Sequence, residues 1–108
     1  MEIVFITKYF HISHIISHIK RIHLTIIGKV QGVFFRAHTC EKAEKLGVTG
    51  WVANESDGTV VVTAEGPENK LNQFIDWCHS GPSTSEVKKV EVKHHTYTGE
   101  FEDFAIRY

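Results

Sequence analysis

The amino-acid sequence predicts one α+β domain in which an antiparallel sheet carries two helices on one face. The chain has 108 residues, of which 42% are hydrophobic, so it can bury one core but is too short for two domains. Segments with the alternation of a strand and segments with the period of a helix follow one another as strand, helix, strand, strand, helix, strand. That order is typical of a split βαβ arrangement.

The first strand and helix flank a glycine-rich loop. Residues 21–27 alternate between polar and apolar side chains and end in a β-branched pair before Gly28, as in a half-buried strand. After the loop, apolar residues recur at helical spacing from about residue 33 to residue 46. Gly47 is placed to end this helix. We therefore predict a strand, a loop and a helix over 21–46.

A hairpin and a second helix come next. Two β-rich segments, 48–52 and 59–64, flank Asp57-Gly58, a pair that favours a tight turn. Pro67 then stands in the first turn of a segment with apolar residues at helical spacing, which Gly81-Pro82 ends. The hairpin would place two antiparallel strands side by side, and the helix would cover them.

The last part of the chain predicts a strand over 87–92 and a short terminal strand over 101–106. Together the elements predict a ferredoxin-like βαββαβ sandwich. The right-handed crossover rule brings the first loop close to the end of the second strand, so Arg36 and Asn54 could face one pocket. Four aromatic residues are predicted in the core, together with Cys78: Trp51, Trp77, Phe74 and Phe104.

The first twenty residues differ in composition from the rest, so we divide the chain into an extension of uncertain structure, 1–20, and a domain, 21–108. The extension lacks a secretion signal and a membrane-length apolar run. His11, His14 and His18 recur at helical spacing and could bind a metal. With no carboxylate or cysteine nearby to complete a ligand set, they more simply form the polar side of an amphipathic segment. An unstructured tail, or a later translation start, is the other alternative.

Composition narrows the partners. The formal charge is −1 and no basic stripe occurs, which disfavours nucleic acid, as does the lack of exposed aromatics in the ribonucleoprotein pattern. Cys40 and Cys78 form no Cys-x-x-Cys motif and neither precedes an arginine at thiol-phosphatase spacing. Reduced thiols suit a cytoplasmic protein, and we expect no metal and no membrane association.

The loop from Gly28 to Arg36 has the features of an anion cradle. A helix N-terminus presents amides without intrahelical partners and a partial positive charge, and Arg36 would add a planar fork for the same anion. The residues alone also permit a turn whose glycines only relieve strain. Asn54, likewise, could be a simple turn residue.

Ordered blocks of residues decide between these alternatives. They are Gly28-x-Val30-Gln31-Gly32-Val33-x-Phe35-Arg36, Ala43-x-x-Leu46-Gly47-Val48-x-Gly50-Trp51-Val52-x-Asn54, Asp57-Gly58-x-Val60, Gly66, Phe74, Trp77, Gly81-Pro82 and Phe104-x-Ile106. In this series the chain resembles the acylphosphatases from about Arg21 to Tyr108. Phe34 departs from the glycine of many members, although larger residues are familiar there and only its backbone amide is required.

The resemblance implies a small enzyme that hydrolyses the carboxyl-phosphate bond of acyl phosphates to a carboxylate and inorganic phosphate, without metal or organic cofactor. The family's essential arginine and asparagine fall on Arg36 and Asn54. The phosphate cradle would consist of the backbone amides of Gln31, Gly32, Val33, Phe34, Phe35 and Arg36. We expect a standalone hydrolase, because the chain ends directly after the domain, and we expect it to be a cytoplasmic monomer.

The implied roles agree with the chemistry of the side chains. A carboxamide cannot act as a general base, so Asn54 would orient a water while Arg36 and the loop hold the phosphoryl group. A non-catalytic anion-binding or protein-interaction module on the same fold is the alternative. Such a module has no need of a water-orienting amide, which favours the enzyme. A domain of a longer carbamoyl-transfer maturation protein is a further possibility.

Overall fold

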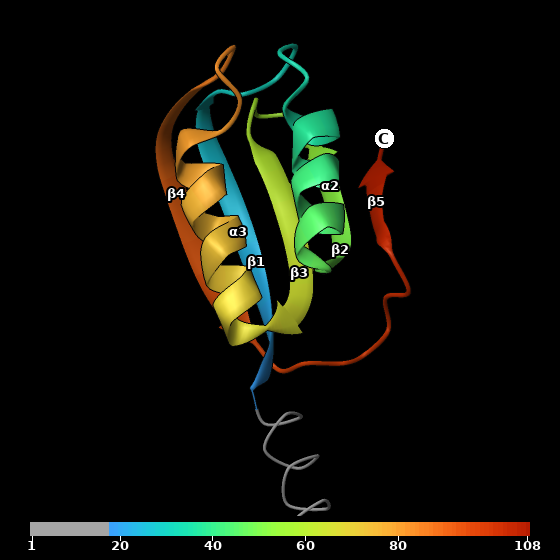
Figure 1. Cartoon of the computed structure of the whole chain (residues 1–108). Coiled ribbons are helices and arrows are strands. Elements are labelled where there is room, and N and C mark those ends of the chain that lie inside the picture. Colours follow the sequence, from blue (N-terminus) through green and yellow to red (C-terminus); the bar gives the residue numbers. More distant parts are fainter. Residues whose placement is uncertain (1–17) are drawn as a thin grey trace, which may run out of the picture.

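The structure of the protein, a computed structural model, describes residues 18–108. A five-stranded sheet is covered on one face by two helices that lie side by side (Figure 1). The strands are β1 (Ile19–Lys29), β2 (Thr49–Asn54), β3 (Val60–Pro67), β4 (Glu86–His95) and β5 (Phe104–Arg107), and the helices are α2 (Phe35–Leu46) and α3 (Glu68–Ser80).

The strand order across the sheet is β4-β1-β3-β2-β5. β1 lies antiparallel between β3 and β4, and β2 and β3 form the predicted hairpin. β5 pairs parallel to β2, so the sheet is antiparallel apart from this edge. The predicted βαββαβ order with two helices on one face is confirmed. The terminal strand is shorter than the predicted 101–106, since it begins at Phe104.

Alternation along the strands places the core between the sheet and the helices. Ile22, Leu24 and Ile26 of β1 are fully buried, and their neighbours on β3 are equally buried apolar residues. Large side chains of this kind contribute about 1.5–3 kcal/mol each when they leave water. Helices and the other strands complete the core with Val30, Phe35, Ala43, Val48, Val52, Leu71, Phe74, Cys78 and Phe104. Within residues 18–108, no helix lies on the other face of the sheet.

Trp51 was predicted in the core, and this prediction is wrong. Val52 points into the core, so its neighbour Trp51 lies on the helix-free face, where it is half-buried. The Arg107 guanidinium lies 4.6 Å from the centre of the indole, and the His23 ring lies 6.2 Å away. The other predicted core aromatics lie in the core or pack against it: Phe74, Phe104 and Trp77.

The two ends of the sheet differ in what they carry (Figure 1). At one end lie the β1–α2 loop, the β2–β3 turn and the α3–β4 loop. At the other end the segment 96–103 passes beneath the sheet from β4 to β5, on opposite edges. The residues of the predicted site lie at the first end, and a buried ionic cluster lies at the second end.

Glu65 of β3 is the centre of this cluster, with a relative exposure of only 1%. Its carboxylate accepts hydrogen bonds from the Arg21 guanidinium at 3.2 Å, from the Thr98 amide at 2.9 Å, from the Thr98 hydroxyl at 3.0 Å and from the Gly99 amide at 3.1 Å. Arg21 also lies 5.2 Å from the centre of the Phe101 ring. The buried charge thus fixes the crossing segment to the sheet.

The first strand begins earlier than predicted, because β1 starts at Ile19 rather than at residue 21. His18 precedes it, with Nδ1 3.8 Å from Oε2 of Glu68 at the start of α3. The predicted division between 1–20 and 21–108 stays a prediction, and His11 and His14 lie outside the described residues. Within the described part of the chain, no helix is long and apolar enough to cross a membrane.

Candidate active site

Gly28 is the second-last residue of β1, directly before the loop. Its φ is +144°, and a Cβ there would lie 2.0 Å from the carbonyl oxygen of Glu86 on β4, so only glycine allows the two backbones to approach this closely. The pairing of β1 with β4 shifts register between Ile27 and Gly28. The pairing continues to Lys29, so this irregularity lies in the strand just before the predicted cradle.

Phe34 sets the start of α2. It is left-handed, with φ 62° and ψ 23°, and is the only such residue other than glycine in the described chain. The helix therefore begins at Phe35 rather than at the predicted residue 33. No side chain caps this end, and no acidic residue lies in its first turn. The amides at the start of α2 thus keep their capacity to bind an anion.

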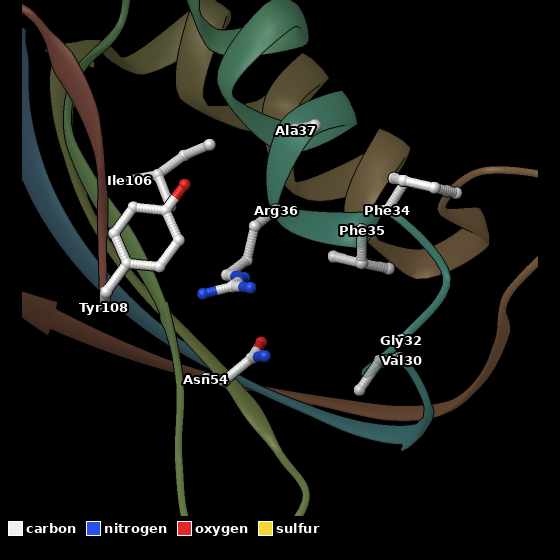
Figure 2. Close-up of a pocket in the computed structure, with 9 residues that line it drawn as sticks. All are labelled: Val30, Gly32, Phe34, Phe35, Arg36, Ala37, Asn54, Ile106 and Tyr108. Carbon is white, nitrogen blue, oxygen red and sulfur yellow. The ribbon is translucent and has the colours of Figure 1, made fainter.

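The structure brings Arg36 and Asn54 to one place, although 18 positions separate them. Arg36 is the second residue of α2, and Asn54 is the last residue of β2, on the helix side of the sheet beside Val60. Figure 2 shows the Arg36 guanidinium between the Tyr108 ring and the Asn54 carboxamide. The guanidinium carbon lies 4.9 Å from the centre of the Tyr108 ring. The ring thus holds one side of the guanidinium and leaves the other toward Asn54.

A cavity of about 300 Å³ lies between these groups. Its volume is at the lower end of the range for small-ligand sites. Among the described residues, its wall does not include Gln31 or Val33, although both belong to the predicted cradle. The wall consists of Val30, Gly32, Phe34, Phe35, Arg36, Ala37, Asn54, Ile106 and Tyr108. Four of the six predicted cradle residues thus line the cavity.

Asn54 has an unusual hydrogen-bonding state. Its Oδ1 is the single buried side-chain oxygen or nitrogen within residues 18–108 that has no hydrogen-bond partner. An unpaired buried polar atom costs about 1–3 kcal/mol, so such atoms are rare, and a catalytic role is one of the reasons for which they occur. Because Asn54 lines the cavity, a molecule there can supply the hydrogen that Oδ1 lacks.

Three hydrogen bonds from two side chains, Gln31 and Thr84, hold the loop from outside. The Gln31 amide nitrogen donates to the carbonyl oxygens of Glu55 at 2.7 Å and Thr59 at 2.9 Å, in the β2–β3 turn. The Thr84 hydroxyl donates to the carbonyl oxygen of Val33 at 2.9 Å. Sequence reasoning missed both contacts, because main-chain carbonyls are acceptors at every position and leave no residue-specific signal.

The other candidate nucleophiles do not suit the reaction. Burial strongly raises the pKa of the Cys78 thiol in the core, and burial, followed by a hydrogen bond to Glu44, raises the pKa of Cys40. Neither cysteine forms a disulfide, and a raised pKa disfavours the nucleophilic thiolate. His38 lies on the exposed side of α2 and does not line the cavity. The site therefore offers amides, a guanidinium and a carboxamide.

Comparison with known proteins agrees with this geometry. The family model described as Acylphosphatase matches residues 22–106. An acylphosphatase of Syntrophus aciditrophicus (strain SB) is 51% identical over 89 residues, which cover 82% of this chain and 93% of the relative. An acylphosphatase of Pyrobaculum arsenaticum is 51% identical over 87 residues, 80% of this chain and 92% of that protein.

A solved structure shares the fold as well as the sequence. The crystal structure of acylphosphatase from Bacillus subtilis superposes with a TM-score of 0.80 at 35% identity, over 82% of this chain and 99% of that one. Both comparisons favour the enzyme over a non-catalytic module on the same fold. With its fold, its cavity and these relatives in agreement, the chain belongs to the acylphosphatase family and is an enzyme that hydrolyses acyl phosphates.

Proposed function

We propose that Arg36 and the loop amides hold the phosphoryl group of an acyl phosphate while Asn54 orients the attacking water. The observation that carries this division of roles is the unpartnered Oδ1 of Asn54 in the wall of the cavity that also contains Arg36. A phosphate site alone would need donors, and Oδ1 is an acceptor. A water can donate to this oxygen and direct a lone pair toward phosphorus.

The phosphoryl group would lie against the start of α2. The backbone amides of Gln31, Gly32, Val33, Phe34, Phe35 and Arg36 are the proposed donors. The first turn has neither a cap nor an acidic residue, so nothing on the helix competes with the substrate for these amides. The Arg36 guanidinium adds two parallel donors and a fixed positive charge. Preorganised donors of this kind stabilise the charge on the phosphoryl oxygens in the transition state.

The chemistry then needs little else. The water oxygen forms a bond to phosphorus, the bond from phosphorus to the acyl oxygen breaks, and the electron pair leaves with the carboxylate. A carboxylate departs without a proton from a general acid. Asn54 cannot accept the water proton, so this proton passes to a phosphoryl oxygen of the substrate. The products are a carboxylate and inorganic phosphate.

Three further expectations follow from this proposal. Since Arg36 supplies the positive charge and the leaving group is stable, we propose that turnover needs no metal. The unpaired thiols of Cys40 and Cys78 are compatible with a reducing compartment, so we propose a cytoplasmic enzyme. A complete site within one chain, with every proposed group on residues 31–54, needs no second copy, which supports a monomer.

The test is hydrolysis of an aryl acyl phosphate in the presence of a metal chelator, with Arg36→Ala, Asn54→Ala and the control His38→Ala. We expect kcat to fall by about 10²–10³ in each of the first two variants, the usual loss on removal of one preorganised donor. Inorganic phosphate should still inhibit Asn54→Ala and should inhibit Arg36→Ala only weakly. His38→Ala should match the unaltered protein, because its side chain is exposed.

Several outcomes would contradict the proposal. Full activity of either variant would remove that residue from the reaction, and loss of activity on chelation would require a metal. A bell-shaped profile of kcat/KM that follows an enzyme histidine, and disappears when that histidine is replaced, would exclude proton transfer to the substrate.

A further inference from the structure

Gln31 is the one cradle residue whose side chain leaves the cradle and contacts the segment that follows Asn54. Its main chain belongs to the predicted phosphate loop. Its amide nitrogen donates one hydrogen bond to the Glu55 carbonyl at 2.7 Å and one to the Thr59 carbonyl at 2.9 Å. Both hydrogens of the amide are therefore used, and both acceptors lie in the β2–β3 turn.

The turn that Gln31 contacts is itself closely bonded. The Glu55 amide donates to the Thr59 carbonyl at 2.9 Å, and the Gly58 amide donates to the Glu55 carbonyl at 3.2 Å. The Asp57 carboxylate accepts from the Thr59 amide at 3.0 Å and from its hydroxyl at 2.7 Å. Gln31 thus contacts a turn that its own hydrogen bonds hold together, and Asn54 directly precedes this turn in the chain.

A second contact on the same loop has a different destination. Thr84 donates to the Val33 carbonyl at 2.9 Å, but Thr84 lies in the α3–β4 loop, remote from Asn54 in the chain. Both contacts restrain the phosphate loop, and only the Gln31 contact relates it to β2. Thr84 is therefore a matched control for loop restraint without an effect on Asn54.

We infer that the Gln31 side chain is a positioning residue that fixes the Asn54 carboxamide relative to the phosphate loop. This inference rests on the proposed roles of the loop and Asn54. Oδ1 of Asn54 has no protein partner to hold it, so its position depends on the backbone that carries it. Gln31 connects that backbone to the loop through two hydrogen bonds, and the alignment of water with phosphorus depends on the connection.

The consequence is a specific kinetic signature. Phosphate binding depends on main-chain amides and Arg36, which a change of the Gln31 side chain leaves in place. Water alignment depends on the distance between loop and Asn54, and a misplacement of about 1 Å can reduce a rate by as much as 10²-fold. Loss of the Gln31 side-chain amide should therefore lower kcat and leave the inhibition constant of phosphate unchanged.

The experiment compares Gln31→Met, which keeps the length of the side chain but not its donors, with the control Thr84→Val. We expect kcat for an aryl acyl phosphate to fall by roughly 10- to 100-fold in Gln31→Met, with unchanged inhibition by inorganic phosphate. Thr84→Val should keep kcat. Unfolding in urea, measured for both, identifies any variant whose loss comes from instability.

A double variant decides whether Gln31 acts through Asn54. If it does, Gln31→Met should not lower the residual kcat of Asn54→Ala further, because no carboxamide is left to position. Multiplicative losses, a weaker phosphate inhibition in Gln31→Met, or an equal loss of kcat in Thr84→Val would each overturn the inference. If Asn54→Ala alone keeps full activity, the proposed function fails first, whereas full activity of Gln31→Met alone refutes only this inference.

Discussion

The two ends of β3 differ in whether the buried polar atoms beside them have hydrogen-bond partners. At one end, Asn54 lies beside Val60, and its Oδ1 is buried with no hydrogen-bond partner. At the other end, Glu65 is buried, and both of its carboxylate oxygens accept hydrogen bonds. Oε2 accepts from Arg21 and Thr98, and Oε1 accepts from the Gly99 amide in the segment that crosses beneath the sheet. Glu65 is five positions after Val60, so the contrast arises within one strand.

This contrast indicates that the chain gives up stability at the site where function requires it. At the end with Glu65, both carboxylate oxygens have hydrogen-bond donors, and these bonds connect β3 to Arg21 on β1 and to the segment 96–103. At the end with Asn54, a buried acceptor has no hydrogen-bond partner. The helix α2 begins there without a side-chain cap, and Phe34 adopts a left-handed conformation. Strain and unmet hydrogen-bonding capacity concentrate at functional sites, where a ligand supplies what the protein does not.

The largest effect is expected at the satisfied end. Glu65→Ala should lower the free energy of unfolding by about 3–5 kcal/mol, the cost of breaking a buried ion pair and leaving donors unpaired. Urea unfolding measures this change. At a temperature well below the unfolding transition kcat should stay the same, because Glu65 lies at the end of the sheet away from the cavity.

A matched variant sharpens this prediction. Glu100 also accepts from Arg21, at 2.5 Å, but its side chain is half exposed, at 54%. Glu100→Ala should therefore destabilise the protein far less than Glu65→Ala, since water replaces an exposed partner. Equal losses in the two variants would show that burial does not distinguish the contacts of Arg21.

At the unsatisfied end, a change should increase stability. Phe34 is left-handed, which costs a residue with a side chain about 1–2 kcal/mol, and its own side chain is 76% exposed. Phe34→Gly removes this strain at an entropic cost of about 0.5–1 kcal/mol, so the free energy of unfolding should rise by up to about 1.5 kcal/mol. Phe34→Ala keeps the strain and should give no gain. A loss of stability in Phe34→Gly would mean that its exposed ring makes a favourable contact.

The smallest effect concerns pH and the helix-free face. Burial is the first cause that lowers the pKa of His23, followed by the positive charges of His95, Lys93 and Arg21. The unfolded chain then binds a proton more readily than the folded chain, so stability should fall as the pH decreases through about 6.5 toward the lowered value. Histidine titrates over about pH 5 to 7. In that range, the free energy of unfolding of His23→Asn should depend less on pH than that of the unaltered protein. An unchanged slope of urea-unfolding free energy against pH would contradict it.

The order of elements was predictable because each is encoded locally. Alternation marked β1, helical spacing with Pro67 marked α3, and Asp57-Gly58 marked the turn. The start of α2 was misplaced by two residues, because spacing carries no information about the left-handed Phe34. Trp51 was assigned to the wrong face, although parity alone could have placed it, since Trp51 and Asn54 differ by an odd number of positions and must face opposite sides.

The site was predictable to the extent that its residues stand in recognisable blocks. Arg36 and Asn54 were named together because two blocks carried them, and the fold places them in one cavity. The contacts of Gln31 and Glu65 were not predictable, since each depends on partners 24 to 44 positions away. A buried glutamate in a run of β-branched residues gives no indication of which distant cation satisfies it.

The strand order described above also determines when the cavity can exist during folding. Of the neighbours in β4-β1-β3-β2-β5, only β2 and β3 follow each other directly in the chain. The other pairings must close long loops before they gain any contacts, which makes folding slower than in proteins with local contacts. Because β3 lies between β2, which ends in Asn54, and β1, which leads to Arg36, we expect hydrolysis to recover during refolding only together with the non-local β1–β3 pairing.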